Sequence, residues 1–347
     1  MKNILVAPLN WGLGHATRCI PVIQALLDHG FNPIIASDGV ALELLQKEFP
    51  SLQSIELPSY QIEYAKKEAY FKWKLLWNSP KMIAAILAEK NRTRQIVETY
   101  QIDGIISDNR LGVYSHKVTS IFITHQLNVM TGNTTWLTTK LHQLFIKKFD
   151  ECWVPDVNTV PNLSGALGHP EIVPKNVKYI GPLCRLHKKN LPKKYDLMVI
   201  LSGPEPQRTM LEEKLLTELK AYRGDILFVK GKIESQQKIE KQAQFTFYNY
   251  MDSKQIEIAF NESERILCRS GYTTVMDLAK LKKKAFFIPT PGQYEQEYLA
   301  KKFKEEGLIP SCKQDKFKLH KLDKIDVYKG LRNFESHTKW KDLFEVF

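Results

Sequence analysis

Residues 268–278 read CRSGYTTVMDL, and residues 286–297 read FFIPTPGQYEQE. The first run joins the end of an apolar strand, a glycine turn and a hydroxyl-rich helix start. At a helix N-terminus, backbone N–H groups and the helix dipole favour an anion. We therefore expect Gly271 to let the backbone turn closely and Thr273 and Thr274 to face a diphosphate. An ordinary helix start uses the same residue types, so spacing alone weighs both readings equally.

The carboxylate of Asp277 follows Thr274 by three residues, on nearly the same face of the predicted helix. At that distance from a diphosphate it suits the vicinal hydroxyls of a ribose. The second run is a strand end, a Pro/Gly turn and a polar helix start, and its Gln and Glu side chains can bind several hydroxyls together. Alone, this second run could equally be a capped helix.

Strand and helix patterns alternate around these runs from the first residues onward. Short apolar strands are expected at 3–8, 33–37, 102–108, 120–125 and 152–156, and then at 196–201, 225–230, 245–250, 265–268 and 285–289. Helical segments separate most of them. This alternation predicts an α/β protein made of two Rossmann-like doubly wound domains that face each other across a cleft.

The chain of 347 residues is long enough for two such domains. A stretch rich in lysine and proline, ending near Lys194, is the best candidate for a linker. We predict an N-terminal acceptor-binding domain at 1–182 and a C-terminal donor-binding domain at 183–330. Residues 331–347 are expected to form a helical segment that docks on the body of the protein.

Composition bounds the class of protein. A hydrophobic content of 43% with 25% charged residues is typical of a globular chain. The longest apolar run, residues 82–88, is far short of the roughly 20 residues that span a bilayer, and the first residues do not resemble a signal peptide. A cytoplasmic protein is expected. The five scattered cysteines show no zinc-binding spacing and are expected to be reduced.

A net charge of +12 favours anionic partners, although a solvated lysine-rich surface would have the same composition. No motif typical of nucleic-acid binding accompanies the charge. Residues 60–86 interleave aromatic side chains with lysines. That pattern suits the interface of an anionic membrane or a lipid-linked acceptor, or else a segment that packs on its own domain.

The two opening runs resemble the donor-binding half of GT-B glycosyltransferases. The group, glycosyltransferase family 28-like, includes the peptidoglycan lipid II N-acetylglucosaminyltransferase and monogalactosyldiacylglycerol synthase. Its nucleotide-sugar signature is S-R-[AS]-G-x-x-T-[VL]-x-E, and Asp277 stands here at the glutamate position, one methylene shorter. The resemblance implies that Thr274 contacts phosphate, that Asp277 contacts the ribose, and that Gln296 and Glu297 read sugar hydroxyls.

The same resemblance extends the donor site to two other strand ends. Tyr250 and Met251 correspond to the segment whose backbone reads the uracil edge. The turn at 202–208 replaces the family's glycine-rich phosphate loop and keeps one glycine; Arg208 could supply charge there or cap its own helix. The full donor set is Ser202, Gly203, Arg208, Tyr250, Met251, Arg269, Ser270, Gly271, Thr273, Thr274, Asp277, Gln293, Gln296 and Glu297.

In the first half, the loop NWGLGHATR at 10–18 resembles the N-terminal loop of the same family. A histidine on a loop at the carboxyl end of a strand is a candidate general base for an acceptor hydroxyl. His15 and Asp108 are the catalytic candidates, and the sequence does not decide between them. The acceptor side is expected to include Gly14, Arg18, His125 and Asn128, with His125 a further base candidate.

These observations predict an inverting hexosyl- or N-acetylhexosaminyltransferase that uses a UDP-sugar. No cofactor and no metal ion are expected, because the chain lacks a DxD-like pair at a strand end. A lipid-linked acceptor, a peripheral location on the inner face of the membrane and a role in cell-envelope glycans are further expectations. Two alternatives stay open: a UDP-sugar hydrolase of nonulosonic acid synthesis, whose similar loop histidine activates water, and a non-catalytic nucleotide-sugar binder.

Overall fold

The computed structural model describes the chain except for residues 61–70, 133–134, 332–333 and 335–337, and except for the side chains of residues 71–81. Contacts divide it into two compact units. The first contains residues up to Leu183 together with the C-terminal segment that ends at Phe347, and the second begins at Cys184. Each unit is described by itself.

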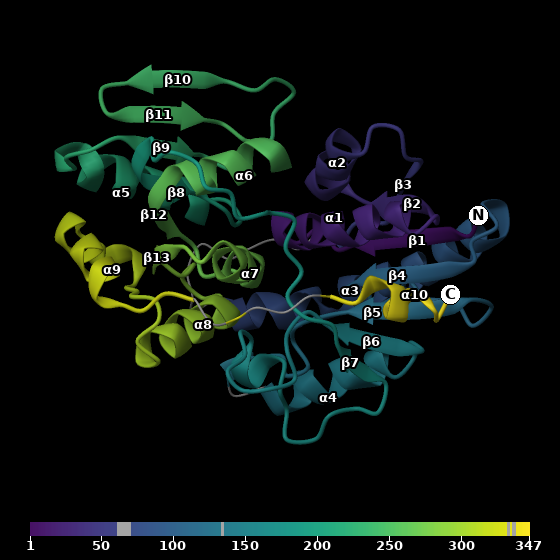
Figure 1. Cartoon of the computed structure of the whole chain (residues 1–347). Helices are drawn as coiled ribbons and strands as arrows, with labels where there is room; N and C mark the ends of the chain where they lie inside the picture. The colour runs from purple at the N-terminus through teal and green to yellow at the C-terminus, as the bar shows by residue number, and fades with distance from the viewer. Residues whose placement is uncertain (61–70, 133–134, 332–333, 335–337) are drawn as a thin grey trace. The chain divides into compact units, whose positions relative to one another are not determined.

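The first unit is built on a seven-stranded parallel sheet, in the order β3-β2-β1-β4-β5-β6-β7 (Figure 1). Its strands are β1 (Asn3–Pro8), β2 (Asn32–Ser37), β3 (Ser54–Glu56), β4 (Gly104–Asp108), β5 (Thr119–Ile123), β6 (Glu151–Val154) and β7 (Val177–Tyr179). Its helices are α1 (Leu13–Asp28), α2 (Gly39–Glu48), α3 (Phe71–Thr99), α4 (Thr135–Ile146) and α10 (Trp340–Phe344).

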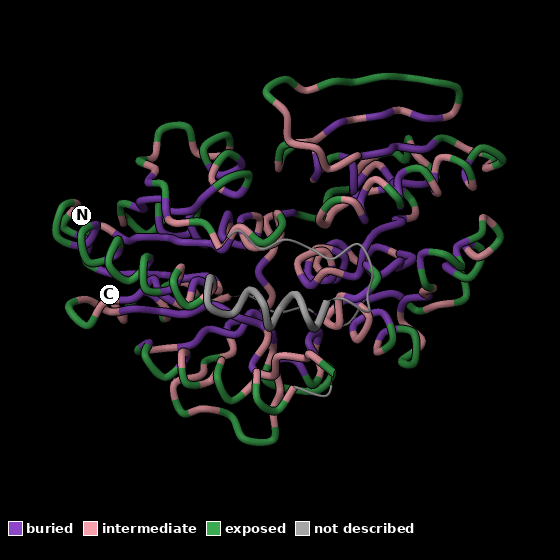
Figure 2. The backbone as a smooth tube through the Cα atoms, turned by 180° about the vertical axis from the view of Figure 1, so that it is seen from behind, coloured by how far each residue is buried: buried purple, intermediate pink, exposed green. Residues whose placement is uncertain are grey.

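Burial explains why these short runs become strands. The central strands of a parallel sheet are covered on both faces, so they read as continuous apolar runs, and Leu5, Ile105 and Phe122 are fully buried. The strands of both sheets are largely buried in Figure 2. Strand order matters most for function: β1 pairs with β4, and Pro8 lies opposite Asp108. The loop that leads into α1 therefore starts beside the carboxyl end of β4.

The second unit has a six-stranded sheet in the order β10-β11-β9-β8-β12-β13, in which only the β10–β11 pair is antiparallel. Its strands are β8 (Tyr195–Ile200), β9 (Ile226–Val229), β10 (Ile239–Gln242), β11 (Phe245–Tyr248), β12 (Ser263–Cys268) and β13 (Lys284–Phe287). Its helices are α5 (Gln207–Glu218), α6 (Ser253–Glu262), α7 (Tyr272–Leu281), α8 (Tyr294–Glu305) and α9 (Lys324–Val327). Cys268 pairs with Ile200 on one side and Phe287 on the other, so three strands end together.

The predicted α/β class is confirmed, with three strands missed. β6 is not the last strand of the first sheet, because β7 pairs with it in parallel. β3 and β7 have three residues each, which is too short for a recognisable pattern. β10 is an exposed edge strand with little apolar content, so it lacks the alternation that burial imposes.

The C-terminal helix α10 packs against the first unit through aromatic rings. The ring of Phe344 lies 5.5 Å from the rings of His29 and Phe31 and 6.4 Å from that of Trp153. All five cysteines carry free thiols, as expected. Within the described residues, no helix is both long enough and apolar enough to cross a membrane.

Candidate active site

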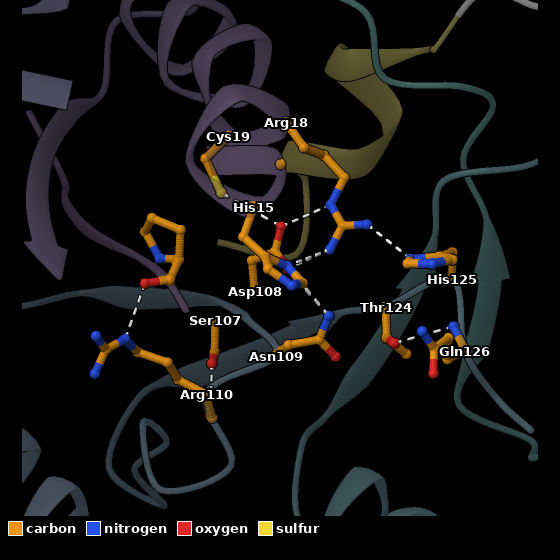
Figure 3. Close-up of polar contacts among 12 residues, drawn as sticks. His15, Arg18, Cys19, Ser107, Asp108, Asn109, Arg110, Thr124, His125 and Gln126 are labelled. Atoms are coloured by element: carbon orange, nitrogen blue, oxygen red, sulfur yellow. Dashed lines mark hydrogen bonds and ion pairs between the residues drawn. The ribbon is translucent and has the colours of Figure 1, made fainter. Parts of the chain in front are cut away.

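Side chains from three elements meet at the carboxyl edge of the first sheet (Figure 3). His15 and Arg18 lie on α1, Asp108 ends β4, and His125 follows β5. The His15 Nδ1 and Asp108 Oδ1 atoms are 2.8 Å apart, and Arg18 Nε donates to Asp108 Oδ2 at 2.7 Å. Arg18 Nη1 lies 2.9 Å from His125 Nδ1. The structure thus brings together four residues that the sequence analysis proposed separately.

Exposure separates the two candidate bases. The side chain of Asp108 is fully buried, whereas that of His15 is 17% exposed. Burial alone would raise the pKa of Asp108, but the charge of Arg18 and the contact with His15 outweigh burial and hold it well below its usual range. Asp108 is therefore a permanent carboxylate that cannot reach a substrate, and His15 is the member of the pair that can.

The start of α1 has a glycine N-cap and no side-chain cap. Gly12 is the N-cap, with φ of 78°, a left-handed conformation that favours glycine, and no side chain caps the helix. Gly14 lies in the first turn, where its carbonyl accepts from Thr17 Oγ1 at 3.0 Å. Asn128 Nδ2 donates to the carbonyl of Ala166, in the 3-10 helix Gly165–Leu167, at 2.6 Å, and its place on the acceptor side stays a prediction.

In the second unit, residues 268–278 form the predicted strand end, turn and helix start. β12 ends at Cys268 and α7 begins after the N-cap Gly271, which has no side-chain cap. A Cβ placed on Gly271 would meet nothing within 4 Å, so the space beside this backbone is empty of protein atoms. Thr273 and Thr274 sit half-buried in the first turn. The arrangement can accept a diphosphate at the helix start.

Two members of the predicted donor set connect this turn to neighbouring segments through side-chain hydrogen bonds. Arg269 is buried, and its guanidinium donates to the carbonyls of Ile288, Pro289 and Gln207 at 3.1, 3.1 and 2.9 Å. Ser270 is also buried and donates to the carbonyl of Gln296 at 2.7 Å. Their side chains hold the ends of neighbouring elements, and a contact of these two residues with the donor stays a prediction.

The polar residues of the second run hold their own turn. Gln296 Oε1 accepts from the backbone N–H of Thr290 at 2.9 Å, and its Nε2 donates to Gln293 Oε1. Glu297 Oε1 accepts from the N–H of Gly292 at 3.1 Å. These bonds hold the turn before α8, whose N-cap Gln293 makes no side-chain cap bond, and sugar binding by these side chains stays a prediction.

Asp277 has a partner that the sequence analysis did not foresee. Its Oδ1 accepts from Cys184 Sγ at 3.0 Å, and Arg185 lies close enough to act on its charge. Burial raises the pKa of Asp277 to about 6, and Arg185 and Cys184 only partly offset it. No motif marks Cys184, which lies 93 residues away in sequence.

The other predicted donor residues fall at neighbouring strand ends. Ser202 and Gly203 follow β8, and a Cβ on Gly203 would lie 3.6 Å from Thr290 Oγ1. Arg208 forms ion pairs with Glu205 and Glu212, so its charge is balanced within its own helix region.

Tyr250 and Met251 follow β11, three places from β12 in the sheet order. The backbone N–H of Tyr250 donates to Asn249 Oδ1 and its carbonyl accepts from Gln237 Nε2. Both backbone groups of Tyr250 therefore have partners, and contact of Tyr250 or Met251 with a base stays a prediction.

The metal and membrane expectations concern side chains that the structure describes only in part. Among the described residues, no three His, Cys, Asp or Glu side chains are grouped so that they could hold a metal ion. Most of the aromatic and lysine-rich segment 60–86 lies outside the described residues or side chains. Tyr60 is described, and its hydroxyl donates to Glu89 Oε2 at 2.5 Å.

Comparison with known proteins gives a family match for part of the chain, and the fold. Residues 206–337 match a model described as glycosyltransferase family 28 C-terminal domain. Curated protein sequences include no match to the chain. The second half of the chain is therefore similar to the C-terminal domain of glycosyltransferase family 28.

Solved structures are similar over nearly the whole chain. The glycotransferase of kitacinnamycin has 12% identity and a TM-score of 0.64, covering 99% of this chain and 98% of its own. MurG from Acinetobacter baumannii has 14% identity and a TM-score of 0.55, covering 95% and 91%. The spinosyn rhamnosyltransferase SpnG complexed with thymidine diphosphate has 12% identity and a TM-score of 0.56, covering 90% and 86%. These likenesses confirm the predicted two-domain GT-B fold.

Proposed function

We propose that the protein transfers a hexosyl or N-acetylhexosaminyl group from a UDP-sugar to an acceptor hydroxyl, with inversion and without a metal ion. One observation carries the proposal: the partly exposed His15 is held by the buried carboxylate of Asp108 at 2.8 Å. The family match of residues 206–337 supports sugar transfer as the class of reaction.

Each partner of this pair has a proposed role. When Nδ1–H of His15 donates to Asp108, the lone pair of Nε2 can take a proton from the acceptor hydroxyl. Asp108 then stabilises the imidazolium and keeps the ring oriented, without becoming protonated itself. The acceptor oxygen attacks the anomeric carbon as the bond to the diphosphate breaks. A single displacement of this kind inverts the configuration.

The donor is proposed to bind the second unit, with its diphosphate at the start of α7. The developing charge on the leaving diphosphate would be stabilised there by backbone N–H groups. Binding of thymidine diphosphate by the structural neighbour SpnG supports a pyrimidine nucleotide as the carrier. Asp277, on the same helix, is the candidate for the ribose hydroxyls.

The acceptor is proposed to lie at an anionic membrane surface. The described residues of α4 support this, because Trp136, Leu137, Leu141 and Leu144 are each at least half exposed. They gather on one face of the helix. Lys140 lies over the ring of Trp136, with Nζ 4.2 Å from its centroid, and exposed lysines follow at 147 and 148. Apolar side chains flanked by lysines fit a bilayer with anionic headgroups.

Vesicle binding tests the membrane part. Sedimentation with vesicles of phosphatidylcholine and phosphatidylglycerol should recover the protein, and the double variant Trp136→Ser, Leu141→Ser should stay in solution. Ile172→Ser is the matched control, because Ile172 is 84% exposed in the same unit but outside α4. Equal binding by all three proteins would refute the assignment of this face.

A nucleotide panel tests the catalytic part. UDP and UDP-sugars should raise the melting temperature, because a ligand of the folded state stabilises it by mass action. Mixtures of donor and acceptor, analysed by NMR, should then give a product of inverted anomeric configuration in the presence of EDTA. Free sugar as the main product, whether or not acceptor is present, would indicate the hydrolase instead. No response to any nucleotide diphosphate would overturn the proposal.

A further inference from the structure

Three buried side-chain atoms at the carboxyl edge of the second sheet have no hydrogen-bond partner among the described residues. They are Gln207 Oε1, Arg269 Nε and Thr290 Oγ1. Arg269 and Thr290 are each 1% exposed, and Gln207 is 8% exposed. Buried polar groups in folded proteins nearly always have a partner, so each of these atoms calls for an explanation. Together they indicate a site for a polar ligand.

Hydrogen bonds of Arg269 bring the segments that carry these atoms together. Its Nη1 donates to the carbonyls of Ile288 and Pro289, which directly precede Thr290. Its Nη2 donates to the carbonyl of Gln207 at the start of α5. One guanidinium therefore contacts both segments that carry the other two unpartnered atoms.

The charge of Arg269 indicates what kind of ligand this edge favours. No carboxylate of the described residues pairs with the guanidinium. Burial lowers the pKa of Arg269 to about 9, and no neighbouring charge offsets that effect. A buried charge without a counter-charge is costly, and an anion bound nearby would reduce the cost. The site therefore favours an anion over a neutral sugar.

The hydroxyl of Thr290 borders the turn that follows β8. A Cβ placed on Gly203 would have Thr290 Oγ1 as its nearest neighbour, at 3.6 Å, and a Cβ on Gly271 would meet nothing within 4 Å. Gly203 has φ of 102°, a conformation that favours glycine. The two turns follow β8 and β12, which are paired strands. A phosphate oxygen can therefore approach both backbones, and it can reach Thr290 Oγ1 from the side of Gly203.

We propose that Thr290 is a further donor-binding residue, whose hydroxyl donates a hydrogen bond to a phosphate oxygen of the nucleoside diphosphate. The inference rests on the proposed donor site at the start of α7. Thr290 lies in the second sequence run but outside the donor set that the family resemblance implies. The amide of Gln207 can present its N–H groups to the same anion after a half turn, because the two ends of an amide are nearly equal in shape.

Thr290→Val separates ligand binding from structure. Valine has the shape of threonine without the hydroxyl, and removing an unpartnered buried hydroxyl relieves its desolvation cost. The variant without ligand should therefore melt at or above the temperature of the wild type. Its Kd for UDP, measured by isothermal titration calorimetry, should rise by about 10- to 100-fold, the loss expected for a hydrogen bond to a charged group. Thr290→Ser keeps the hydroxyl and should keep the Kd within about threefold of the wild type.

Thr93→Val is the matched control. Thr93 Oγ1 is also buried without a partner among the described residues, but it lies on α3 in the first unit. This variant should likewise melt at or above the wild-type temperature, with an unchanged Kd for UDP. Uridine has no phosphate, so the thermal shift that it causes at millimolar concentration should be the same in Thr290→Val as in the wild type.

Each contrary result has a distinct meaning. A Kd for UDP unchanged in Thr290→Val would overturn the proposal and leave an ordered water as the partner of the hydroxyl. A lower melting temperature of the unliganded variant, or an equal loss of uridine binding, would overturn it as well, because the hydroxyl would then serve the fold or the nucleoside. Failure of the wild type to bind UDP would overturn the proposed donor site itself, and this inference with it.

Discussion

Replacing Asp108 by Asn probes the centre of the proposed mechanism. The carboxylate accepts from His15 Nδ1 and Arg18 Nη2 at Oδ1, and from Arg18 Nε and Cys19 Sγ at Oδ2. An amide has one oxygen, so either orientation opposes an N–H group to a donor of Arg18. When the amide N–H faces His15, the ring proton moves to Nε2 and the base is lost.

The buried ion pair and the orienting contact determine the expected losses of stability and of kcat. Removing one partner of a buried ion pair costs about 3–5 kcal/mol, so Asp108→Asn should lower the free energy of unfolding by roughly that amount. Loss of the orienting carboxylate should lower kcat by on the order of 10³- to 10⁴-fold. Donor affinity should not change, because the proposed donor site lies in the second unit.

Two assays separate these effects. Urea denaturation gives the free energy of unfolding, and initial rates at saturating donor give kcat below the melting temperature of the variant. The wild-type contribution of Asp108 should be present above about pH 4, the ordinary carboxyl range, and be lost as pH falls below it, since the folded-state pKa is depressed. A folded Asp108→Asn protein with kcat within tenfold of wild type would refute the reasoning.

Three further predictions concern other parts of the chain. Gly112→Ala should lower the free energy of unfolding in urea by about 1–3 kcal/mol, because its Cβ would lie 2.3 Å from the carbonyl oxygen of Ile86; unchanged stability would contradict this packing. Gly271→Ala should leave stability within about 0.5 kcal/mol but weaken the thermal shift caused by UDP, and an undiminished shift would mean that phosphate does not approach this backbone. Burial raises the pKa of Asp277 to about 6, so the stability of the wild type should fall as pH rises from about 4 through 6. The stability of Asp277→Asn should not show that fall, and a pH profile of stability identical to that of the wild type would contradict the burial of the Asp277 carboxyl.

The secondary structure could be predicted where burial imposes a pattern. The run ILVAP in β1 and the apolar face of α1 are recognisable because their side chains are buried among other apolar side chains. β10 carries exposed residues along its whole length, so nothing in its sequence reflects pairing with β11. Local patterns therefore predict buried elements and miss exposed edges.

The sequence predicts which residues lie at strand ends, but not which of their side chains contact one another. His15 comes after one recognisable strand and Asp108 ends another, and their contact spans 93 residues because β1 and β4 are neighbours. Strand order is a tertiary property that one sequence does not state. The same holds for the Cys184–Asp277 contact, and for the engagement of Gln296 with its own turn, since each depends on which polar partner is nearest after folding.

The central claim is that His15 acts as the base while a separate site holds the donor. The most direct measurement compares His15→Gln with wild type in the same UDP-sugar assay, with the thermal shift by UDP measured on both proteins. The account predicts an unchanged thermal shift and sugar transfer reduced by about 10²- to 10⁴-fold. Transfer at the wild-type rate by a His15→Gln protein that binds UDP normally would contradict it.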